Sequence, residues 1–180
     1  MTEFEILKLV GKRLNNLNIN YMISGSVALN FYSEPRMTRD IDIVIEIEKN
    51  DVEKFYQLFK NDFYIDKDMI FDAINNKSMF NIISLGSIIK IDFIIKKNEE
   101  YRILEFNRRN KIKTDEMELY IVSIEDLIIS KLFWAKDTLS EIQLNDVFKL
   151  MSNKIDLNYI KKWSKILKID NILNKVLKNE

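Results

Sequence analysis

Apolar residues recur along the chain with two spacings, and each spacing predicts one kind of secondary structure. A repeat of three to four residues is typical of an amphipathic helix, and a short apolar or alternating run is typical of a strand. In the first part of the chain the helical spacing covers 3–17, 26–31, 51–60, 68–75 and 100–106. The strand pattern covers 21–24, 40–47, 63–65, 79–85 and 88–96. We therefore expect a β-sheet flanked by helices.

Beyond residue 98 the strand signals become sparse and the helical spacing dominates. Short extended pieces within 110–122 come before helical runs at 123–137, 139–151, 157–167 and 172–177. Ser123 begins the first of these helices with the pattern Ser-x-x-Asp, in which the serine hydroxyl accepts a backbone N–H of the first turn. We predict an α+β fold in which residues 1–98 form the core, with the sheet complete by residue 98. Residues 99–180 form a mostly helical region packed on that core as a single compact unit.

The charges change this picture only locally. The chain has 28 basic and 28 acidic side chains, so it has no global field of the kind expected if the whole surface coated nucleic acid. Within 149–180, eight lysines accompany three acidic residues, a local excess of five positive charges. This excess is typical of a solvated helix face, and the alternative is a surface that contacts RNA or phosphate.

The absence of cysteine and histidine restricts the chemistry. Without cysteine the chain has no disulfide and no thiolate metal site, which disfavours zinc and suits a reducing cytoplasm. Without histidine, catalysis must rest on carboxylates, Lys, Arg, Ser, Thr or Tyr, and a metal must be bound by oxygen ligands. The N-terminal segment lacks a signal-peptide pattern, and no stretch has the apolar length of a membrane span. We expect a soluble cytoplasmic protein.

The predicted strand at 40–47 carries two carboxylates on one face. Alternation places its isoleucines on one side and Asp40 and Asp42 on the other. The two Cα atoms lie about 6.5 Å apart along a strand, so both side chains can bind one hard cation or a pair of metal ions about 3.5–4 Å apart. Mg²⁺ prefers such oxygens together with water and phosphate. Taken alone, the pattern fits a half-exposed strand with a wet face equally well.

A third carboxylate, Asp92, interrupts the strongly apolar strand IIKIDFII. Its immediate neighbours are apolar, and alternation places it on the same face as Lys90. An unpaired buried carboxylate costs several kcal/mol, so an aspartate at this position needs a partner. A metal ion shared with Asp40 and Asp42 supplies one. The alternative is a strand edge at which Asp92 pairs with Lys90.

A Gly-Ser pair lies between the predicted strand at 21–24 and the predicted helix at 26–31. Gly25 ends the strand and Ser26 opens the helix, an arrangement that presents free backbone N–H groups and a hydroxyl to a phosphate. The chain has only three glycines, so the placement is informative. By itself, Gly-Ser is also a common structural turn.

In their order and spacing these residues resemble the nucleotidyltransferase superfamily of the DNA polymerase β type: Gly25-Ser26, a short helix, Asp40-Ile41-Asp42, and Asp92 on a neighbouring strand. The segment SGSVALNFYSEPRMTRDIDIVIE is similar to the small bacterial and archaeal members, which include antibiotic-modifying enzymes and members of toxin–antitoxin or abortive-infection systems. The resemblance covers residues 20–95 and is only architectural beyond them. It implies a mixed β-sheet flanked by helices, with a C-terminal helical region.

The resemblance also implies a reaction and a role for each residue. The reaction transfers a nucleoside monophosphate from an NTP to an acceptor hydroxyl and releases pyrophosphate, with Mg²⁺ or Mn²⁺ as cofactor. Asp40 and Asp42 bind the metal ion that carries the triphosphate, and Gly25 and Ser26 hold the β- and γ-phosphates. Asp92 completes a second metal site and is also the candidate base.

Three basic residues are candidates for contact with the triphosphate. Arg36 and Arg39 lie in the loop before the metal-binding strand and can hold phosphate or the leaving group. Arg39 is the stronger candidate of the two, although it can equally pair with the aspartate beside it. Lys131 resembles basic residues of the family that follow the sheet and reach the triphosphate, and the alternative is a surface lysine.

Two aromatic residues follow Lys131 on the same predicted helix. Phe133 and Trp134 are expected in the hydrophobic core rather than as a platform for base stacking, because aromatic residues at helical spacing usually pack.

Two other functions remain open. One is a partner protein that keeps the fold and acts by binding without turnover, for example with a cognate toxin or antitoxin, although the intact Ser26 and aspartates argue against it. The other is a structural protein whose carboxylates pair with Lys90 and Arg39, which predicts those ion pairs and no cleft.

For an enzyme, the acceptor is a tRNA, a side chain of a partner protein or a small hydroxylated molecule. The basic segment 149–180 favours RNA slightly, and no motif in the sequence selects one NTP.

Overall fold

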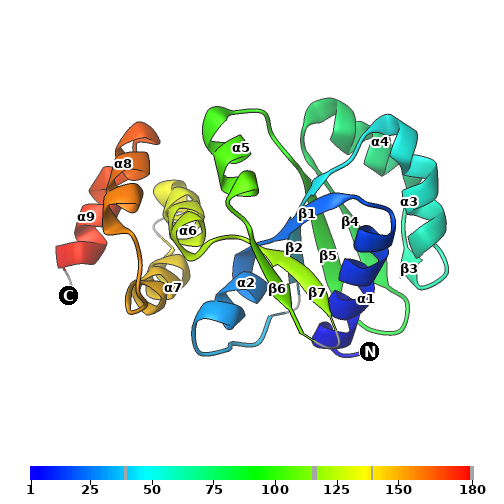
Figure 1. Cartoon of the computed structure of the whole chain (residues 1–180), viewed down its shortest axis with the longest axis horizontal. Coiled ribbons are helices and arrows are strands. Elements are labelled where there is room, and N and C mark those ends of the chain that lie inside the picture. The colour runs from blue at the N-terminus through cyan, green and yellow to red at the C-terminus, as the bar shows by residue number, and fades with distance from the viewer. Residues whose placement is uncertain (39, 115–116, 139, 179–180) are drawn as a thin grey trace.

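The computed structural model of the chain describes residues 1–38, 40–114, 117–138 and 140–178. In these ranges the helices are α1 (Glu3–Asn16), α2 (Gly25–Tyr32), α3 (Val52–Phe59), α4 (Lys67–Asn76), α5 (Glu100–Asn107), α6 (Ile124–Thr138), α7 (Glu141–Met151), α8 (Leu157–Ile166) and α9 (Asp170–Lys178), with a short 3₁₀ helix, η1 (Lys49–Asp51), before α3. The strands are β1 (Asn20–Ile23), β2 (Asp40–Glu46), β3 (Phe63–Tyr64), β4 (Met79–Ser84), β5 (Lys90–Ile95), β6 (Asn110–Lys113) and β7 (Glu118–Ile121). The predicted α+β class is confirmed (Figure 1).

The strands form one mixed sheet in the order β3-β4-β5-β2-β1-β7-β6. β2 runs parallel to β5, and β1 runs parallel to β7, whereas the other neighbouring pairs are antiparallel. The strand that carries Asp40 and Asp42 is therefore the central one, paired on both sides. Pairing on both sides fixes the position of its side chains along the strand and the face of the sheet to which they point.

The expectation that the sheet is complete at residue 98 is wrong. β7 lies beside β1 with Ile121 opposite Ile23, and the N–H of Val122 donates to the carbonyl of Ile23 over 2.9 Å. β6 pairs with β7 at the sheet edge. Both strands have only four residues, and β6 is mostly exposed, so they leave little alternation to recognise. Their position depends on the free edge of β1, far away in sequence, which no local pattern reveals.

One face of the sheet forms the hydrophobic core under α1, α3 and α4 (Figure 1). Phe55 of α3 packs against Phe80 of β4 and Phe93 of β5, with ring centroids 5.6 and 5.2 Å away. Ile41 and Ile43 of β2 are at most 1% exposed on the same face. Because side chains alternate along a strand, burial of these isoleucines turns the aspartates of β2 to the opposite face.

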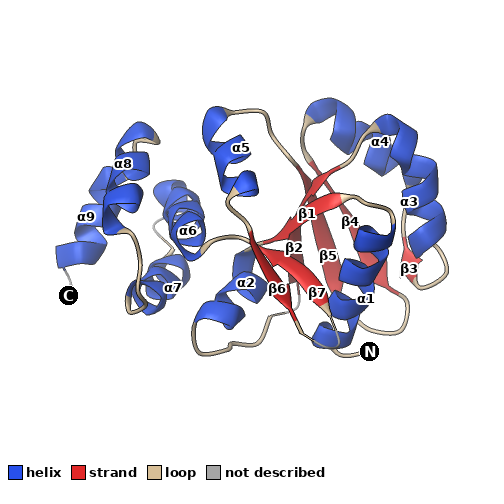
Figure 2. Cartoon of the chain, viewed as in Figure 1, coloured by secondary structure: helices blue, strands red, loops and turns tan. Residues whose placement is uncertain are grey.

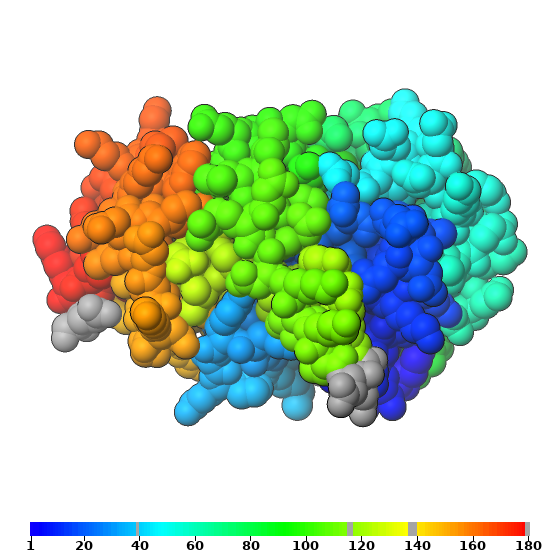
Figure 3. Space-filling model, viewed as in Figure 1, coloured from blue at the N-terminus to red at the C-terminus, as the bar shows by residue number. Residues whose placement is uncertain are grey.

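The C-terminal helices gather around α6 at the other end of the molecule (Figure 2). α6 packs against α2 of the core and against α7, α8 and α9. Tyr101 of α5 packs on Trp163 of α8 with ring centroids 5.0 Å apart, and the surface is continuous from α5 to α8 (Figure 3). Among the described residues, no helix combines the length and the apolar character needed to cross a membrane.

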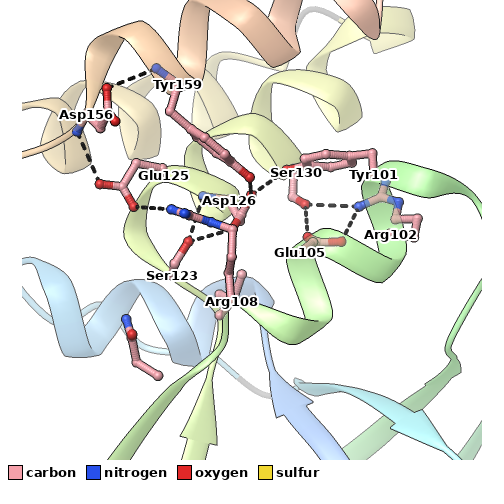
Figure 4. A network of polar contacts seen from close by, with 12 residues as sticks. Tyr101, Arg102, Glu105, Arg108, Ser123, Glu125, Asp126, Ser130, Asp156 and Tyr159 are labelled. Atoms are coloured by element: carbon pink, nitrogen blue, oxygen red, sulfur yellow. Dashed lines mark hydrogen bonds and ion pairs between the residues drawn. The ribbon is translucent and has the colours of Figure 1, made fainter.

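A buried polar network joins the helices of the C-terminal region to one another (Figure 4). The side chain of Asp126, fully buried on α6, accepts hydrogen bonds from the hydroxyls of Ser123, Tyr101 and Tyr159 at 2.6, 3.1 and 2.7 Å, and from Nε of Arg108 at 3.0 Å. The N–H of Asp126 donates to Oγ of Ser123, which confirms the predicted start of this helix. The network joins α5, α6 and α8, so that α6 has a fixed position beside the sheet.

Candidate active site

Gly25, the first residue of α2, approaches the central strand closely. Its φ of +61° is the left-handed conformation that glycine adopts readily. A Cβ on Gly25 would lie 1.9 Å from Oδ2 of Asp42, so no other residue fits without displacing that carboxylate. The N–H of Ser24 donates to the carbonyl of Asp42 over 2.9 Å and holds the two segments together. The contact with Asp42, beyond the turn itself, therefore requires glycine here.

The register of β2 and β5 brings the three predicted aspartates together. Asp42 lies directly opposite Asp92, and Asp40 lies opposite Lys90. Paired residues of neighbouring strands project from the same face, so all three carboxylates share one side of the sheet. Asp92 is 6% exposed, Asp42 is half-buried and Asp40 is exposed. We call Asp40, Asp42 and Asp92 the carboxylate face.

Lys90 lies among these carboxylates. Its Nζ is 2.9 Å from Oδ2 of Asp92 and 3.8 Å from Oδ1 of Asp40. The hydrogen bond to Asp92 raises the pKa of Lys90. Burial, and then the charges of Asp92 and Asp40, raise the pKa of Asp42 to about 6. Burial and repulsion by the other carboxylates therefore raise the pKa of Asp42 more than the nearby ammonium group of Lys90 lowers it. The site favours a further cation.

Two observations fit a divalent cation at the carboxylate face. Oδ1 of Asp92 is buried and has no hydrogen-bond partner among the described residues, and the raised pKa of Asp42 marks a carboxylate short of positive charge. No three acidic side chains in the described ranges are already arranged as a metal site. Mg²⁺ usually takes one or two carboxylates and completes its octahedron with water and substrate phosphate oxygens. The aspartates therefore fit an ion that is bound together with its nucleotide.

Arg36 and Lys131 meet on a shared carboxylate next to Ser26. Nη2 of Arg36 donates to Oγ of Ser26 at 2.6 Å and to Oδ2 of Asp146 at 3.1 Å. Nζ of Lys131 donates to the same Oδ2 at 2.7 Å and to Oε1 of Gln143 at 3.2 Å. Lys131 is 4% exposed, so it is not a surface lysine, and burial lowers its pKa. We call Arg36, Lys131 and Asp146 the cation clamp.

A hollow of about 230 Å³ joins the carboxylate face to the cation clamp. Asp42 of the carboxylate face and Lys131 of the cation clamp line this hollow. The Gly-Ser turn and Gln143 line it as well. The structural-protein interpretation predicts ion pairs and no cleft. The ion pair of Lys90 is present, but so is the cleft, which that interpretation does not predict.

Several solved structures with a similar fold are nucleotidyltransferases or nucleotidyltransferase-like proteins. An antigenic nucleotidyltransferase-like protein from Paracoccidioides brasiliensis has a TM-score of 0.58 and 14% identity, and the match covers 97% of this chain and 91% of that one. The lincosamide antibiotic adenylyltransferase LnuA, bound to lincomycin, has a TM-score of 0.57 and 14% identity over 84% and 98% of the two chains. ANT(2″)-Ia, in complex with adenylyl-2″-tobramycin, has a TM-score of 0.59 and 10% identity over 92% and 95%. The chain has the nucleotidyltransferase fold.

At the sequence level no protein-family model and no curated protein matches the chain. The likeness to the solved nucleotidyltransferases, at 10–14% identity, is therefore one of fold. The roles of individual residues rest on the geometry of this chain.

Four of the residues predicted from the sequence line one hollow: Gly25, Ser26, Asp42 and Lys131. Asp40 and Asp92 lie on the same sheet face beside Asp42. Arg39 lies outside the described residues. The metal-binding, nucleotide-binding and catalytic roles of these residues stay predictions.

Sequence reasoning missed Asp146 and Gln143 of α7 and gave Arg36 less weight than its neighbour in the loop. Asp146 is 2% exposed, and it lies on the buried side of α7 with Val147 and Leu150. An aspartate on the apolar side of a helix is a usable signal, because a buried carboxylate needs a partner. The partner could not be named from sequence, since Arg36 is 110 residues away.

The expectation that Phe133 and Trp134 lie in the core is wrong. Phe133 is 39% exposed and Trp134 is 72% exposed. The buried side of α6 is already occupied by smaller residues, such as Leu132 and Ala135, so the two aromatic side chains point away from the core. Trp134 lines the hollow that contains Asp42.

Proposed function

We propose that the protein is a metal-dependent nucleotidyltransferase that moves a nucleoside monophosphate from an NTP to an acceptor hydroxyl and releases pyrophosphate. The observation that carries the proposal is the contact of Gly25 with Asp42, which joins a phosphate-binding turn to a carboxylate that lies opposite Asp92. A general anion site would need the turn alone, and a general cation site would need the carboxylates alone. A nucleotide with its metal ion needs both in contact.

The phosphate side of the site is formed by the turn and the cation clamp. The N-terminus of α2 presents free backbone N–H groups, to which Ser26 adds a hydroxyl. Arg36 and Lys131 carry two positive charges, one of which Asp146 offsets, and the guanidinium can bind two phosphate oxygens at once. These groups hold the β- and γ-phosphates and stabilise the charge that develops on the leaving pyrophosphate.

The carboxylate face serves the reacting atoms. Asp40, Asp42 and Asp92 hold Mg²⁺ or Mn²⁺, which when bound supplies positive charge at the phosphate oxygens. The acceptor oxygen forms a bond to the α-phosphorus as the bond to the bridging oxygen of pyrophosphate breaks. Asp92 is the candidate for the acceptor's proton, because its Oδ2 is bound by Lys90 whereas Oδ1 has no partner among the described residues.

The acceptor is a tRNA, a side chain of a partner protein or a small hydroxylated molecule. LnuA is a lincosamide adenylyltransferase, and ANT(2″)-Ia holds an adenylylated tobramycin, which supports the small-molecule class for this chain.

The first experiment measures nucleotide binding by thermal shift. The four NTPs, each with and without Mg²⁺ or Mn²⁺, are compared on wild type, on Asp42→Asn and on the matched control Asp72→Asn, which changes an exposed aspartate of α4. We expect a metal-dependent rise in Tm for wild type and for Asp72→Asn, and none for Asp42→Asn, because Asp42 is the central metal ligand. The ligand-induced shift is compared, since the absolute Tm changes with the substitution.

Activity is then measured as transfer of label from an α-labelled NTP to tRNA, cell protein and hydroxylated small molecules. We expect transfer by wild type and a loss of at least about a thousandfold in Asp42→Asn, the size of effect that transition-state electrostatics supports. A wild type that neither shifts with any NTP and metal nor transfers label contradicts the proposal.

A second function, a binding partner without turnover, is favoured by one observation. Lys90 already neutralises Asp92, as it would in a protein that never binds a metal ion. Such a protein, paired with a cognate toxin or antitoxin, shows no metal-dependent nucleotide shift, so the same experiment separates the two functions.

A further inference from the structure

A second hollow, of about 340 Å³, lies beside the one that contains Asp42. The two hollows are adjacent, because they share four lining residues: Ser24, Ile94, Ser130 and Trp134. The first hollow contains the turn and Lys131, whereas the second has apolar walls that include Val44 and Phe133. The first hollow suits phosphate, and the second suits a flat apolar group.

Trp134 stands at the junction of the two hollows. Its side chain is 72% exposed, although indole is large and apolar. An aromatic ring exposed at the mouth of a cavity offers a face for stacking, and such stacking on a nucleic-acid base contributes about 1–3 kcal/mol. The position of Trp134 therefore suits the part of a ligand that follows the phosphates.

Three residues in the lining of the second hollow form a polar, pre-arranged group: Arg102, Glu105 and Ser130 (Figure 4). Nη1 of Arg102 donates to Oε2 of Glu105 at 2.8 Å and to Oγ of Ser130 at 3.2 Å. Oγ of Ser130 donates to Oε1 of Glu105 at 2.7 Å. The guanidinium lies 5.5 Å from the ring centroid of Phe133. Within the described residues only Nη1 of Arg102 is engaged, so its other N–H groups are available to a ligand.

The charged side chains in the lining of the second hollow include more hydrogen-bond donors than acceptors. Lys96, Lys97 and Arg102 line it, against the single carboxylate of Glu105. Lys96 is paired with Glu46, but Lys97 forms no ion pair with any described residue. Ring carbonyl oxygens accept such donors well, whereas an exocyclic amino group does not accept. Uracil, cytosine and guanine have a ring carbonyl, whereas adenine accepts only through its ring nitrogens.

We propose that the second hollow binds the nucleobase of the NTP, stacked on Trp134, and that its donors favour bases with a ring carbonyl over adenine. The inference rests on the proposed function, because it requires the triphosphate to occupy the neighbouring hollow. It assigns a role to Trp134, Lys97 and Arg102 and names the class of nucleotide that the site selects.

The first test separates the base from the phosphates. Binding of UTP and of inorganic tripolyphosphate, each with Mg²⁺, is measured by calorimetry on wild type, on Trp134→Leu and on Tyr64→Leu, a control that removes an exposed aromatic residue of β3. We expect Trp134→Leu to weaken UTP binding about tenfold, the effect of one lost stacking contact, and to leave tripolyphosphate unchanged. Tyr64→Leu should change neither.

Fluorescence provides a second readout that does not depend on a loss of binding. The chain has two tryptophans, and Trp163 is only 5% exposed. Stacking on Trp134 is expected to quench the fluorescence of wild type with UTP and not with tripolyphosphate, and Trp134→Leu should lose the quenching. Quenching that persists in Trp134→Leu overturns the stacking.

The base preference is tested with Lys97→Gln and the exposed control Lys54→Gln. We expect wild type to bind at least one of UTP, CTP and GTP more tightly than ATP, and Lys97→Gln to reduce that difference. Wild-type protein that binds ATP as tightly as the other three NTPs overturns the preference.

The outcomes also separate this inference from the proposed function. If none of the four NTPs binds and tripolyphosphate does not bind either, the proposed function fails. If UTP and tripolyphosphate both bind and Trp134→Leu weakens them equally or not at all, the proposed function stands and the base site is wrong. If Trp134→Leu leaves NTP binding unchanged and raises the KM of the acceptor alone, the second hollow belongs to the acceptor, and the base assignment is overturned.

Discussion

The carboxylate face and the cation clamp are built in opposite ways. The carboxylate face is set by the backbone, because the parallel pairing of β2 and β5 puts Asp42 opposite Asp92. The clamp is held by side chains alone, with Asp146 as the shared acceptor for Arg36 and Lys131. A change in the face should therefore alter chemistry while the fold persists. A change in the clamp should alter stability and binding together.

The largest effect on nucleotide binding is expected at Gly25, where the Gly-Ser turn contacts the carboxylate face. In Gly25→Ala the new Cβ overlaps Asp42 and a left-handed φ is imposed on alanine, so nucleotide binding should be lost and unfolding free energy should fall by at least about 2 kcal/mol. Urea unfolding and the NTP thermal shift measure both. Gly86→Ala is the matched control, because a Cβ there meets nothing within 4 Å. Equal behaviour of the two variants contradicts the close approach.

A substitution in the clamp is expected to have a smaller effect on nucleotide binding. Asp146→Asn leaves Lys131 buried without its anion, and removal of one partner of a buried pair costs about 3–5 kcal/mol, less here because the amide still accepts a hydrogen bond. We expect a loss of about 2–4 kcal/mol in urea unfolding. Pyrophosphate should raise the Tm of the variant more than that of wild type, since it restores the missing negative charge. A smaller pyrophosphate shift in the variant argues against a phosphate role for the clamp.

The carboxylate face should show its character in the pH dependence. The folded pKa of Asp42, about 6, lies above the ordinary 3.8, so the folded state binds more protons between these values and stability falls as pH rises through them. Asp42→Asn cannot ionise and should be more stable than wild type by about 1–3 kcal/mol at pH 7.5, with little difference near pH 4. Urea unfolding at both pH values measures this. If the unfolding free energies of wild type and Asp42→Asn change equally with pH, the carboxylates are not crowded as the structure indicates.

The smallest effect is expected at Lys90, which is partly exposed. Removing its ammonium in Lys90→Gln takes away a competitor for Asp92, so Mn²⁺ should bind about two- to fivefold more tightly, the range of an exposed ion pair. Calorimetric titration with Mn²⁺ measures the change, with Lys67→Gln as a control that breaks an exposed pair far from the site. Weaker Mn²⁺ binding in Lys90→Gln identifies Lys90 as part of the site rather than as a competitor.

The same contrast explains which parts of the site could be predicted from the sequence. Gly25, Asp40, Asp42 and Asp92 each break a local pattern, as a rare glycine or as carboxylates in apolar strands. Their order along the chain resembles that of the nucleotidyltransferase superfamily, and this resemblance predicts that they lie together.

The clamp and the second hollow depend on contacts between distant segments. Asp146 meets Arg36 across 110 residues, and no periodicity encodes that meeting. Trp134 was expected in the core because its spacing is helical, whereas the fold buries Leu132 and Ala135 on that side of α6 instead. The position of β7 was likewise invisible, since four residues give too little alternation to identify a strand.

The pairing of β7 with β1 also determines when the site can form during synthesis. A nascent chain that has not yet reached residue 118 leaves one edge of β1 open, immediately before Gly25. An open strand edge readily pairs with other chains. Lys131 and Asp146 are translated later still, so the part of the chain before residue 118 contains the aspartates of the carboxylate face but neither the complete sheet nor the clamp. We expect chains released before residue 118 to aggregate, and nucleotide binding to be gained only after Asp146 has been synthesised.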